Sequence, residues 1–189
     1  MTQQGKNAID LVLAESLIEL SAKKPIDKIT IKEITDKAGV IRPTFYNHFQ
    51  DKYELIEWII KTELLEPIKL LLNAGMIFEA IVLMLNNISA NSVFYKKALK
   101  LEGAVTFNQI AMKCVCEMFM NIISEKSTGK KSKYRWLTPE VISTYYAQSL
   151  CFITEGWIAQ GMDDIEPKEM AEAYMYLITR SMDDILSEL

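Results

Sequence analysis

Apolar residues recur at helical spacing along most of the chain, and no segment shows a convincing strand pattern. Near the N-terminus, one apolar stripe is formed by Ile9, Leu13, Leu17 and Leu20. The acidic residues Asp10, Glu15 and Glu19 are expected to lie off this stripe. Pro25 and the short stretch after it end the helix. The pattern therefore predicts an all-α protein that opens with an amphipathic helix.

Two short helices are predicted next. Thr30 and Glu33 have the spacing of a capping box, in which each side chain accepts a hydrogen bond from the backbone amide of the other residue. The helix that they open should run to about Ala38, where Gly39 supplies the left-handed residue that ends it. A second short helix is predicted over 42–49. Two short helices joined by a tight turn containing glycine indicate a helix-turn-helix.

A longer helix and a second region follow. Asp51 and Glu54 have the spacing of another capping box, and the helix that they open should kink or end at Pro67. Five more helices are expected over 75–89, 91–101, 104–126, 138–160 and 167–187, which makes about nine in all. We predict a three-helix helix-turn-helix domain over 1–53 and a larger helical domain, for ligand binding and dimerisation, over 54–189.

Composition and charge exclude only a few classes of protein. The chain has 189 residues, a net charge of −4 and three cysteines. Residues 1–55 hold eight basic and eight acidic side chains, so bulk charge does not indicate a nucleic-acid binder. No stretch approaches the roughly 18–20 apolar residues that span a bilayer, and the N-terminus lacks the pattern of a secretory signal. We expect a cytoplasmic protein with no membrane partner.

The second short helix carries the candidate DNA contacts. Ile34, Ala38, Val40, Phe45 and Phe49 can pack against the first helix. This packing leaves side chains suited to bases and phosphates pointing outward. They are Arg42, Pro43, Thr44, Tyr46, Asn47 and His48. Lys52, in the first turn of the next helix, is a candidate for a phosphate contact. The alternative is that these are ordinary solvated residues on a small helix.

The run ITIKEITDKAGVIRPTFYNHFQDKYEL closely resembles the DNA-binding domain of the TetR family of bacterial regulators. The resemblance implies that Thr44, Tyr46, His48 and Lys52 hold phosphates of a double-stranded operator. It also implies that Arg42, Pro43 and Asn47 face its bases. Ile41 departs from the family pattern, which commonly has a Ser or Thr cap there, and Pro43 replaces a small or polar residue. These departures bear on the operator sequence rather than on DNA binding.

The C-terminal region shows a looser resemblance. NSVFYKKALKLEG and YYAQSLCFITEGWIAQGM are similar to a subgroup of the family that includes the activator of dihydroxyacetone kinase genes. In the family the last two helices form a four-helix bundle with a partner copy, which implies a homodimer. Tyr146, Ile153 and Trp157 are the candidate interface residues. The alternative is a helix buried within its own monomer.

A small apolar ligand is a further expectation for the larger domain. The segment 104–126 is rich in methionine and phenylalanine, which suit a promiscuous pocket, although an ordinary helical core has the same composition. The candidate ligand-binding residues are Phe107, Met112, Tyr145 and Gln148. With the resemblance, this predicts a repressor that a small molecule releases from DNA.

Other chemistry finds little support in the sequence. Cys114 and Cys116 would point about 200° apart on a helix, so we expect no metal site. The chain has one histidine, and neither a glycine-rich phosphate loop nor a nucleophile–base spacing, so we expect no cofactor and no enzyme activity. A basic segment is either a nucleic-acid patch or a solvated loop; it contains Lys126, Lys130, Lys131, Lys133 and Arg135.

The neutral charge of residues 1–55, together with Ile41, leaves a second function open. This alternative is a sensor or co-regulator of the same fold, which acts through a protein partner without binding DNA.

Overall fold

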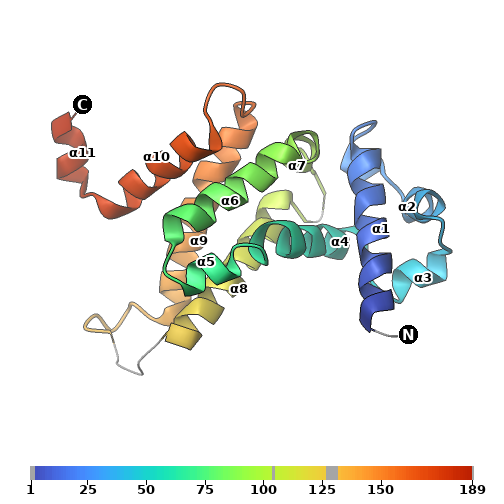
Figure 1. Cartoon of the computed structure of the whole chain (residues 1–189), viewed down its shortest axis with the longest axis horizontal. Coiled ribbons are helices and arrows are strands. Elements are labelled where there is room, and N and C mark those ends of the chain that lie inside the picture. The colour runs from blue at the N-terminus through green and yellow to red at the C-terminus, as the bar shows by residue number, and fades with distance from the viewer. Residues whose placement is uncertain (1–2, 104, 127–131, 189) are drawn as a thin grey trace.

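A computed structural model describes residues 3–103, 105–126 and 132–188, with side chains from residue 8 onward. Within these residues the chain forms eleven α-helices, a short 3₁₀ helix and a π-helical segment, with no strand. In Figure 1 the first three helices lie at one end of the molecule, and α4 leads from them into a larger helical body. The predicted all-α fold, with a small N-terminal helix-turn-helix region and a larger helical region, is confirmed.

The N-terminal region comprises α1 (Gln3–Ser21), a 3₁₀ helix (Ile26–Lys28), α2 (Ile31–Ala38) and α3 (Arg42–Tyr46). The capping box predicted before α2 is present. The Thr30 hydroxyl accepts from the Glu33 amide at 3.3 Å, and the Glu33 carboxylate accepts from the Thr30 amide at 2.9 Å. Gly39 ends α2 with a φ of 69°, which is the left-handed region that favours glycine.

The core of this region is largely the predicted one. Leu13 and Leu17 of α1 are fully buried with Ile34 of α2 and Phe45 of α3. Phe49 is also buried, while Ala38 and Val40 are partly buried against the same core. One prediction was wrong, because Asp10 faces the core and is 7% exposed. Asp10 precedes Leu13 by three residues, so it lies on the same helical face as that leucine.

The connection between the two regions differs in detail from the expected helix. Helix α4 (Lys52–Ile59) continues into the π segment Ile60–Leu65, and after a turn that contains Pro67 the chain forms α5 (Lys69–Asn73). Asp51 caps α4 by accepting hydrogen bonds from the amides of Tyr53 and Glu54. Glu54 does not complete the predicted box, since its carboxylate accepts from the amide of Gln50 instead, at 2.6 Å.

The larger region contains six more helices. They are α6 (Ile77–Ala90), α7 (Ser92–Ala98), α8 (Phe107–Lys126), α9 (Pro139–Ala159), α10 (Pro167–Thr179) and α11 (Met182–Glu188). The single helix predicted over 167–187 was wrong, because Arg180 is extended and separates α10 from α11. Ser181 and Asp184 cause this break by forming a capping box of their own.

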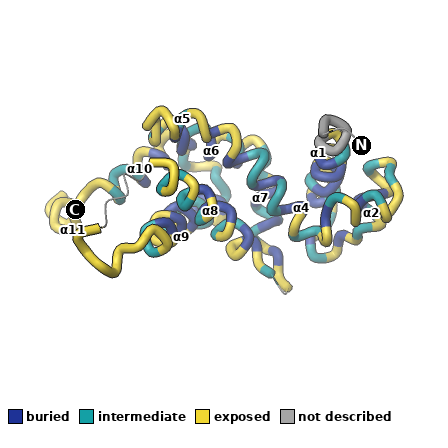
Figure 2. The backbone as a smooth tube through the Cα atoms, turned by 90° about the horizontal axis from the view of Figure 1, so that it is seen from below, coloured by how far each residue is buried: buried dark blue, intermediate teal, exposed yellow. Residues whose placement is uncertain are grey.

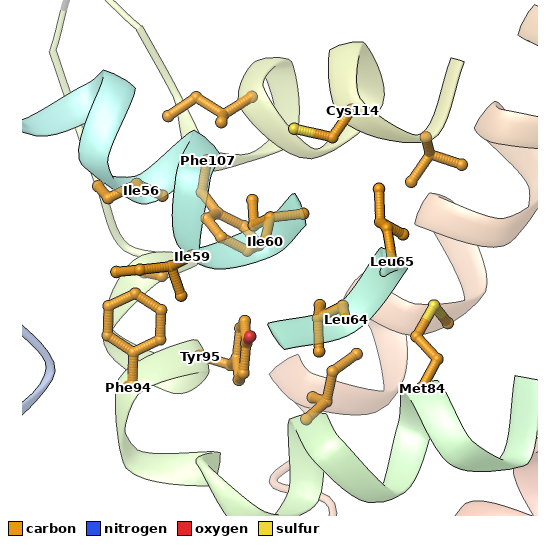
Figure 3. Packing of buried hydrophobic residues seen from close by; sticks show 14 of the residues in the cluster. Ile56, Ile59, Ile60, Leu64, Leu65, Met84, Phe94, Tyr95, Phe107 and Cys114 are labelled. Carbon is orange, nitrogen blue, oxygen red and sulfur yellow. The ribbon is translucent and has the colours of Figure 1, made fainter. Parts of the chain in front are cut away.

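The core of the larger region surrounds the π segment. Figure 3 shows Ile60, Leu64 and Leu65 packed among Met84 of α6, Tyr95 of α7 and Phe107 of α8. Figure 2 shows that α11, by contrast, is exposed along its length, and none of its residues is buried. No single helix in the described ranges is long and apolar enough to cross a membrane. Only the pair α6 and α7, bent by 88°, meets those criteria of length and composition together.

Candidate nucleic-acid interface

Helix α3 presents the predicted recognition surface. Phe45 is fully buried beneath it, whereas Arg42, Pro43, Tyr46 and Asn47 are exposed. Thr44, on the same helix, is half-buried. The buried Phe45 ring meets the Tyr46 ring edge-on at 5.6 Å, which fixes the exposed ring close to the helix surface. The helix therefore combines a rigid core contact with a polar outer face.

The start of α3 has the unusual cap that the sequence indicated. Ile41 stands at the N-cap position, is largely exposed and makes no side-chain hydrogen bond to the helix. Its carbonyl accepts from the Thr44 amide at 2.9 Å. Pro43 occupies the first turn, where the missing amide costs no intrahelical hydrogen bond. Proline thus offsets part of the cost of the absent side-chain cap.

His48 does not lie on the outer face. Its side chain is 2% exposed, and Nδ1 lies 2.6 Å from Oδ1 of Asp10, whose side chain is 9% exposed. The predicted outward position of the His48 side chain is therefore wrong, because its ring is turned into the protein, while its phosphate contact stays a prediction. The pair joins the C-terminal end of α3 to α1, which places His48 in a positioning role.

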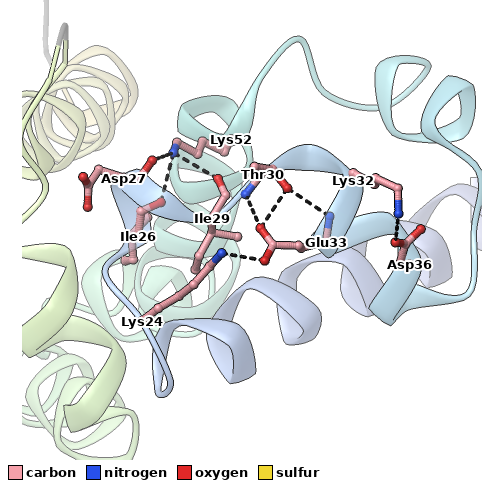
Figure 4. Close-up of polar contacts among 9 residues, drawn as sticks. All are labelled: Lys24, Ile26, Asp27, Ile29, Thr30, Lys32, Glu33, Asp36 and Lys52. Atoms are coloured by element: carbon pink, nitrogen blue, oxygen red, sulfur yellow. Dashed lines mark hydrogen bonds and ion pairs between the residues drawn. The ribbon is translucent and has the colours of Figure 1, made fainter.

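Lys52 is likewise occupied within the protein. Its ammonium donates to the backbone carbonyls of Ile26 at 2.9 Å, Asp27 at 2.7 Å and Ile29 at 3.2 Å, as Figure 4 shows. An ammonium has three N–H donors, so these contacts use all of them. Lys52 thus has a structural role inside the protein, and its phosphate contact stays a prediction. Burial of the ammonium lowers the pKa of Lys52 from its ordinary value.

The basic residues of α2 and its surroundings are neutralised by acids. Lys24 lies 2.5 Å from Glu33, Lys32 lies 2.6 Å from Asp36, and Lys37 pairs with Glu19. Hydrogen bonding from Lys24, with that from Thr30, lowers the pKa of Glu33 to about 2. Arg42, in contrast, has no acidic partner among the described residues and is exposed. Arg42 is consequently the free cation on α3.

The basic segment predicted near residue 130 is only partly described. Lys126 donates to the carbonyl of Leu72 at 2.8 Å, which ties α8 to α5. Lys133 and Arg135 are exposed, whereas Lys130 and Lys131 lie outside the described residues.

The four predicted ligand-binding residues do not converge. Phe107 is buried and lines a small apolar cavity, and Met112 is half-buried against the core. Tyr145 and Gln148 are exposed and line a separate groove on α9. The sequence analysis missed Tyr95 and Thr154, which line the same cavity as Phe107. Nothing in the apolar pattern distinguished these two hydroxyls from the core residues around them.

The predicted dimer residues also differ in exposure. Tyr146 is exposed and Ile153 is half-buried. Trp157 is corrected to an internal residue, since it is 3% exposed and its indole donates to the carbonyl of Ile165 at 2.9 Å. Phe152, which is not one of the three candidate interface residues, is 77% exposed on the same helix. Its i+7 spacing from exposed Tyr145 was the signal that could have identified it.

The cysteines are free thiols. Cys114 and Cys151 are buried, which raises the pKa of each thiol to about 12, and Cys116 is half-buried. In the ranges that the structure describes, no group of three or more His, Cys, Asp or Glu side chains could hold a metal ion.

Comparison with known proteins gives two family matches. Residues 15–59 match the bacterial regulatory proteins of the tetR family, and residues 76–180 match a transcriptional regulator C-terminal region of the TetR series. The second match alone covers more than half of the chain.

Individual relatives have the same class of function. The chain is 26% identical over 156 residues to the dhaKLM operon transcriptional activator DhaS of Lactococcus lactis, which covers 79% of each chain. Among solved structures, a dihydroxyacetone kinase operon activator DhaS superposes with a TM-score of 0.63 at 21% identity, covering 90% of this chain and 93% of that one. NalD of Pseudomonas aeruginosa, the secondary repressor of an efflux pump, gives 0.59 at 13% identity, covering 92% and 96%.

Proposed function

Because the chain belongs to the TetR family of bacterial regulatory proteins, we propose that it binds an operator in double-stranded DNA as a homodimer. The protein is a transcriptional regulator and not an enzyme. The observation that carries the proposal is the outer face of α3, where Arg42, Tyr46 and Asn47 are exposed above the buried Phe45. Arg can bond guanine and Asn can bond adenine through two hydrogen bonds each in the major groove.

Dimerisation is supported by the exposed face of α9. Tyr145, Ser149, Phe152 and Gly156 follow one another at helical spacing, and an added Cβ at Gly156 would meet no atom within 4 Å. Phe152 and Gly156 also line an open groove of about 880 Å³ that continues onto Ala173 of α10. An exposed aromatic beside small residues suits a closely packed helix pair. One short recognition helix reads few base pairs, so two copies on two half-sites are the usual solution.

The proposal has three further parts. The protein is a repressor, a small molecule releases it from DNA, and it acts in the cytoplasm. DhaS is named as an activator and NalD as a repressor, so the relatives include both directions. We keep release of a repressor by a ligand as the prediction for this chain. A ligand that binds with unequal affinity to the DNA-binding conformation and to the released conformation typically changes the free energy of operator binding by about 1–3 kcal/mol.

A gel-shift experiment tests DNA binding. We expect the full chain to retard a fragment from upstream of its own coding sequence, with an affinity that falls as salt is raised. Unlabelled operator should reduce the retarded fraction, and unrelated DNA should not. Absence of a shift that depends on both sequence and salt would favour the alternative, a co-regulator that acts through a protein partner. The internal contacts of His48 and Lys52 are the observations that support this alternative, since both side chains are engaged within the protein.

Arg42 tests base recognition. Replacing Arg42 with alanine should cost about 1–3 kcal/mol of binding free energy at one base position, because a bidentate contact reads a single base pair. Gel shifts against operators mutated one position at a time measure the effect. Lys32→Ala is the matched control, since this exposed cation is already paired with Asp36. An equal loss on every operator would make Arg42 a phosphate contact instead.

A substitution at Lys52 tests its structural role as a donor to three backbone carbonyls. Lys52→Met should lower the free energy of unfolding by about 1.5–3 kcal/mol, because three backbone carbonyls lose a charged donor. Denaturant titration measures this, with Lys28→Met as the control on an exposed lysine of the same segment. The slope of operator affinity against salt tests the predicted phosphate contact. A slope reduced by about 1 would support that contact, and an unchanged slope would limit Lys52 to its role inside the protein.

A further inference from the structure

A small apolar cavity, which is partly open, lies in the larger region where the π segment meets α6, α7, α8 and α9. Its volume is about 40 Å³. Apolar side chains of the π segment, α6, α8 and α9 form most of the wall, among them Ile60, Met84, Phe107 and Leu150, and α7 contributes Tyr95. A single water needs roughly 10–15 Å³ of such space. The cavity therefore has room for about three water-sized groups, and more if its flexible walls yield.

Two hydroxyl groups in this wall lack hydrogen-bond partners. Tyr95 is 1% exposed, and neither its hydroxyl nor that of Thr154 has a partner among the described residues. Both residues line the cavity. In Figure 3 the Tyr95 hydroxyl is the one oxygen atom among the labelled side chains. A buried hydroxyl without a partner is unfavourable, so two of them at one cavity indicate a missing polar group.

The contacts around Tyr95 and Thr154 show how each hydroxyl is held. The Tyr95 ring packs edge-on against Phe94 at 5.1 Å and Phe107 at 6.2 Å, which holds the hydroxyl in place. A threonine inside a helix commonly donates to a carbonyl three or four residues earlier. Ser149 and Thr179 do so in this chain, whereas Thr154 does not. Its hydroxyl stays available for another acceptor or donor.

The charge around the cavity limits what can bind. Among the described residues no Lys, Arg or His lines it, and their one carboxylate there, that of Glu155, accepts a hydrogen bond from Asn108 at 2.5 Å. An anion would therefore enter an apolar site with no countercharge, which is costly. Burial raises the pKa of Tyr95, so its hydroxyl remains protonated and able to donate at neutral pH.

We infer that Tyr95 and Thr154 are the polar anchors of a site for a small uncharged molecule with a carbonyl or hydroxyl oxygen. This inference rests on the proposed function, because it names the class of ligand to which the regulator responds. The proposed site includes residues of the segment that connects the larger region to the DNA-binding region. Ile60 and Leu64 belong to the π segment, and α4 joins this segment to the helix-turn-helix.

Three probes of equal size test the ligand class. 2-Butanone, propionate and butylammonium are titrated at millimolar concentration against the full chain, with the melting temperature as the readout. Only 2-butanone should raise the melting temperature of the wild type. Tyr95→Phe should weaken its binding about tenfold. The same variant should raise the ligand-free melting temperature by about 2–6 °C, because it removes an unpaired buried hydroxyl.

Tyr134→Phe is the matched control, since it removes the same atom from an exposed ring that lines neither the cavity nor the α9 face, and it should change neither quantity. Stabilisation by propionate or butylammonium, or none by 2-butanone, would overturn the inference. An unchanged or lower ligand-free melting temperature for Tyr95→Phe would also overturn it, because the hydroxyl would then be satisfied by water. Operator binding is measured separately without probe. Its absence in the wild type would count against the proposed function and not against the cavity.

Discussion

Replacing Phe152 with aspartate should convert the protein from a dimer to a monomer and lower its affinity for the operator about 10²–10⁴-fold. Phe152 is 77% exposed on α9 and lines the groove shared with Gly156 and Ala173. In a two-fold dimer the same residue meets the interface twice, so the substitution buries two carboxylates without partners. Each half-site would then be bound by a separate monomer, without the gain in effective concentration that a dimer provides.

Sedimentation velocity measures the oligomeric state, and gel shifts on the whole operator and on one half-site measure the affinity. Leu70→Asp is the matched control, because Leu70 on α5 is 82% exposed and lies outside the groove. The two variants carry the same added charge. A Phe152→Asp protein that sediments as a dimer and binds the operator normally would place the interface elsewhere.

The second large effect is expected at the pair between α3 and α1. His48→Leu should lower the free energy of unfolding by about 3–5 kcal/mol, because it leaves the Asp10 carboxylate buried without its partner. The loss should extend to operator binding, since the pair holds the end of the recognition helix against α1. Gln50→Leu is the neighbouring control on an exposed position outside the base-contacting set and should change stability by less than about 0.5 kcal/mol.

A double-mutant cycle separates the pair from its surroundings. Asp10→Leu combined with His48→Leu should recover most of the lost stability, because replacing both members of a buried pair by apolar groups is often neutral. Denaturant titration of the four proteins gives the coupling energy between the two positions. Strictly additive losses would show that the 2.6 Å contact contributes no pairwise energy.

The parts of the fold that could be predicted are those set by local sequence. Thr30 with Glu33 and the left-handed Gly39 define α2 within a few residues, so the sequence alone located that helix. The same local reasoning missed Ser181 with Asp184, although they form the same capping box. An apolar pattern that continues on both sides of a break conceals it, because periodicity records burial and not the path of the backbone.

The partners of polar side chains could not be predicted in this way. Asp10 and His48 are 38 residues apart, and Lys52 reaches carbonyls 23–26 residues earlier. Spacing along one helix gives no information about such contacts, which depend on how helices cross. The assignment of His48 and Lys52 to DNA therefore depended on residue type and on the family resemblance. The buried Tyr95 shows the same limit, since its ring fits the apolar pattern whatever its hydroxyl contacts.

The π segment Ile60–Leu65 forms part of the cavity wall, and it also sets the angle between α4 and the helices that follow. A π-helical turn holds about one residue more than an α-helical turn, and each residue of an α-helix advances it by about 100°. The six residues therefore turn α4 relative to the helices that follow, compared with an uninterrupted helix. Chain length at this point fixes the direction in which the helix-turn-helix faces. Insertions and deletions here are thus constrained by geometry even where side-chain identity is not.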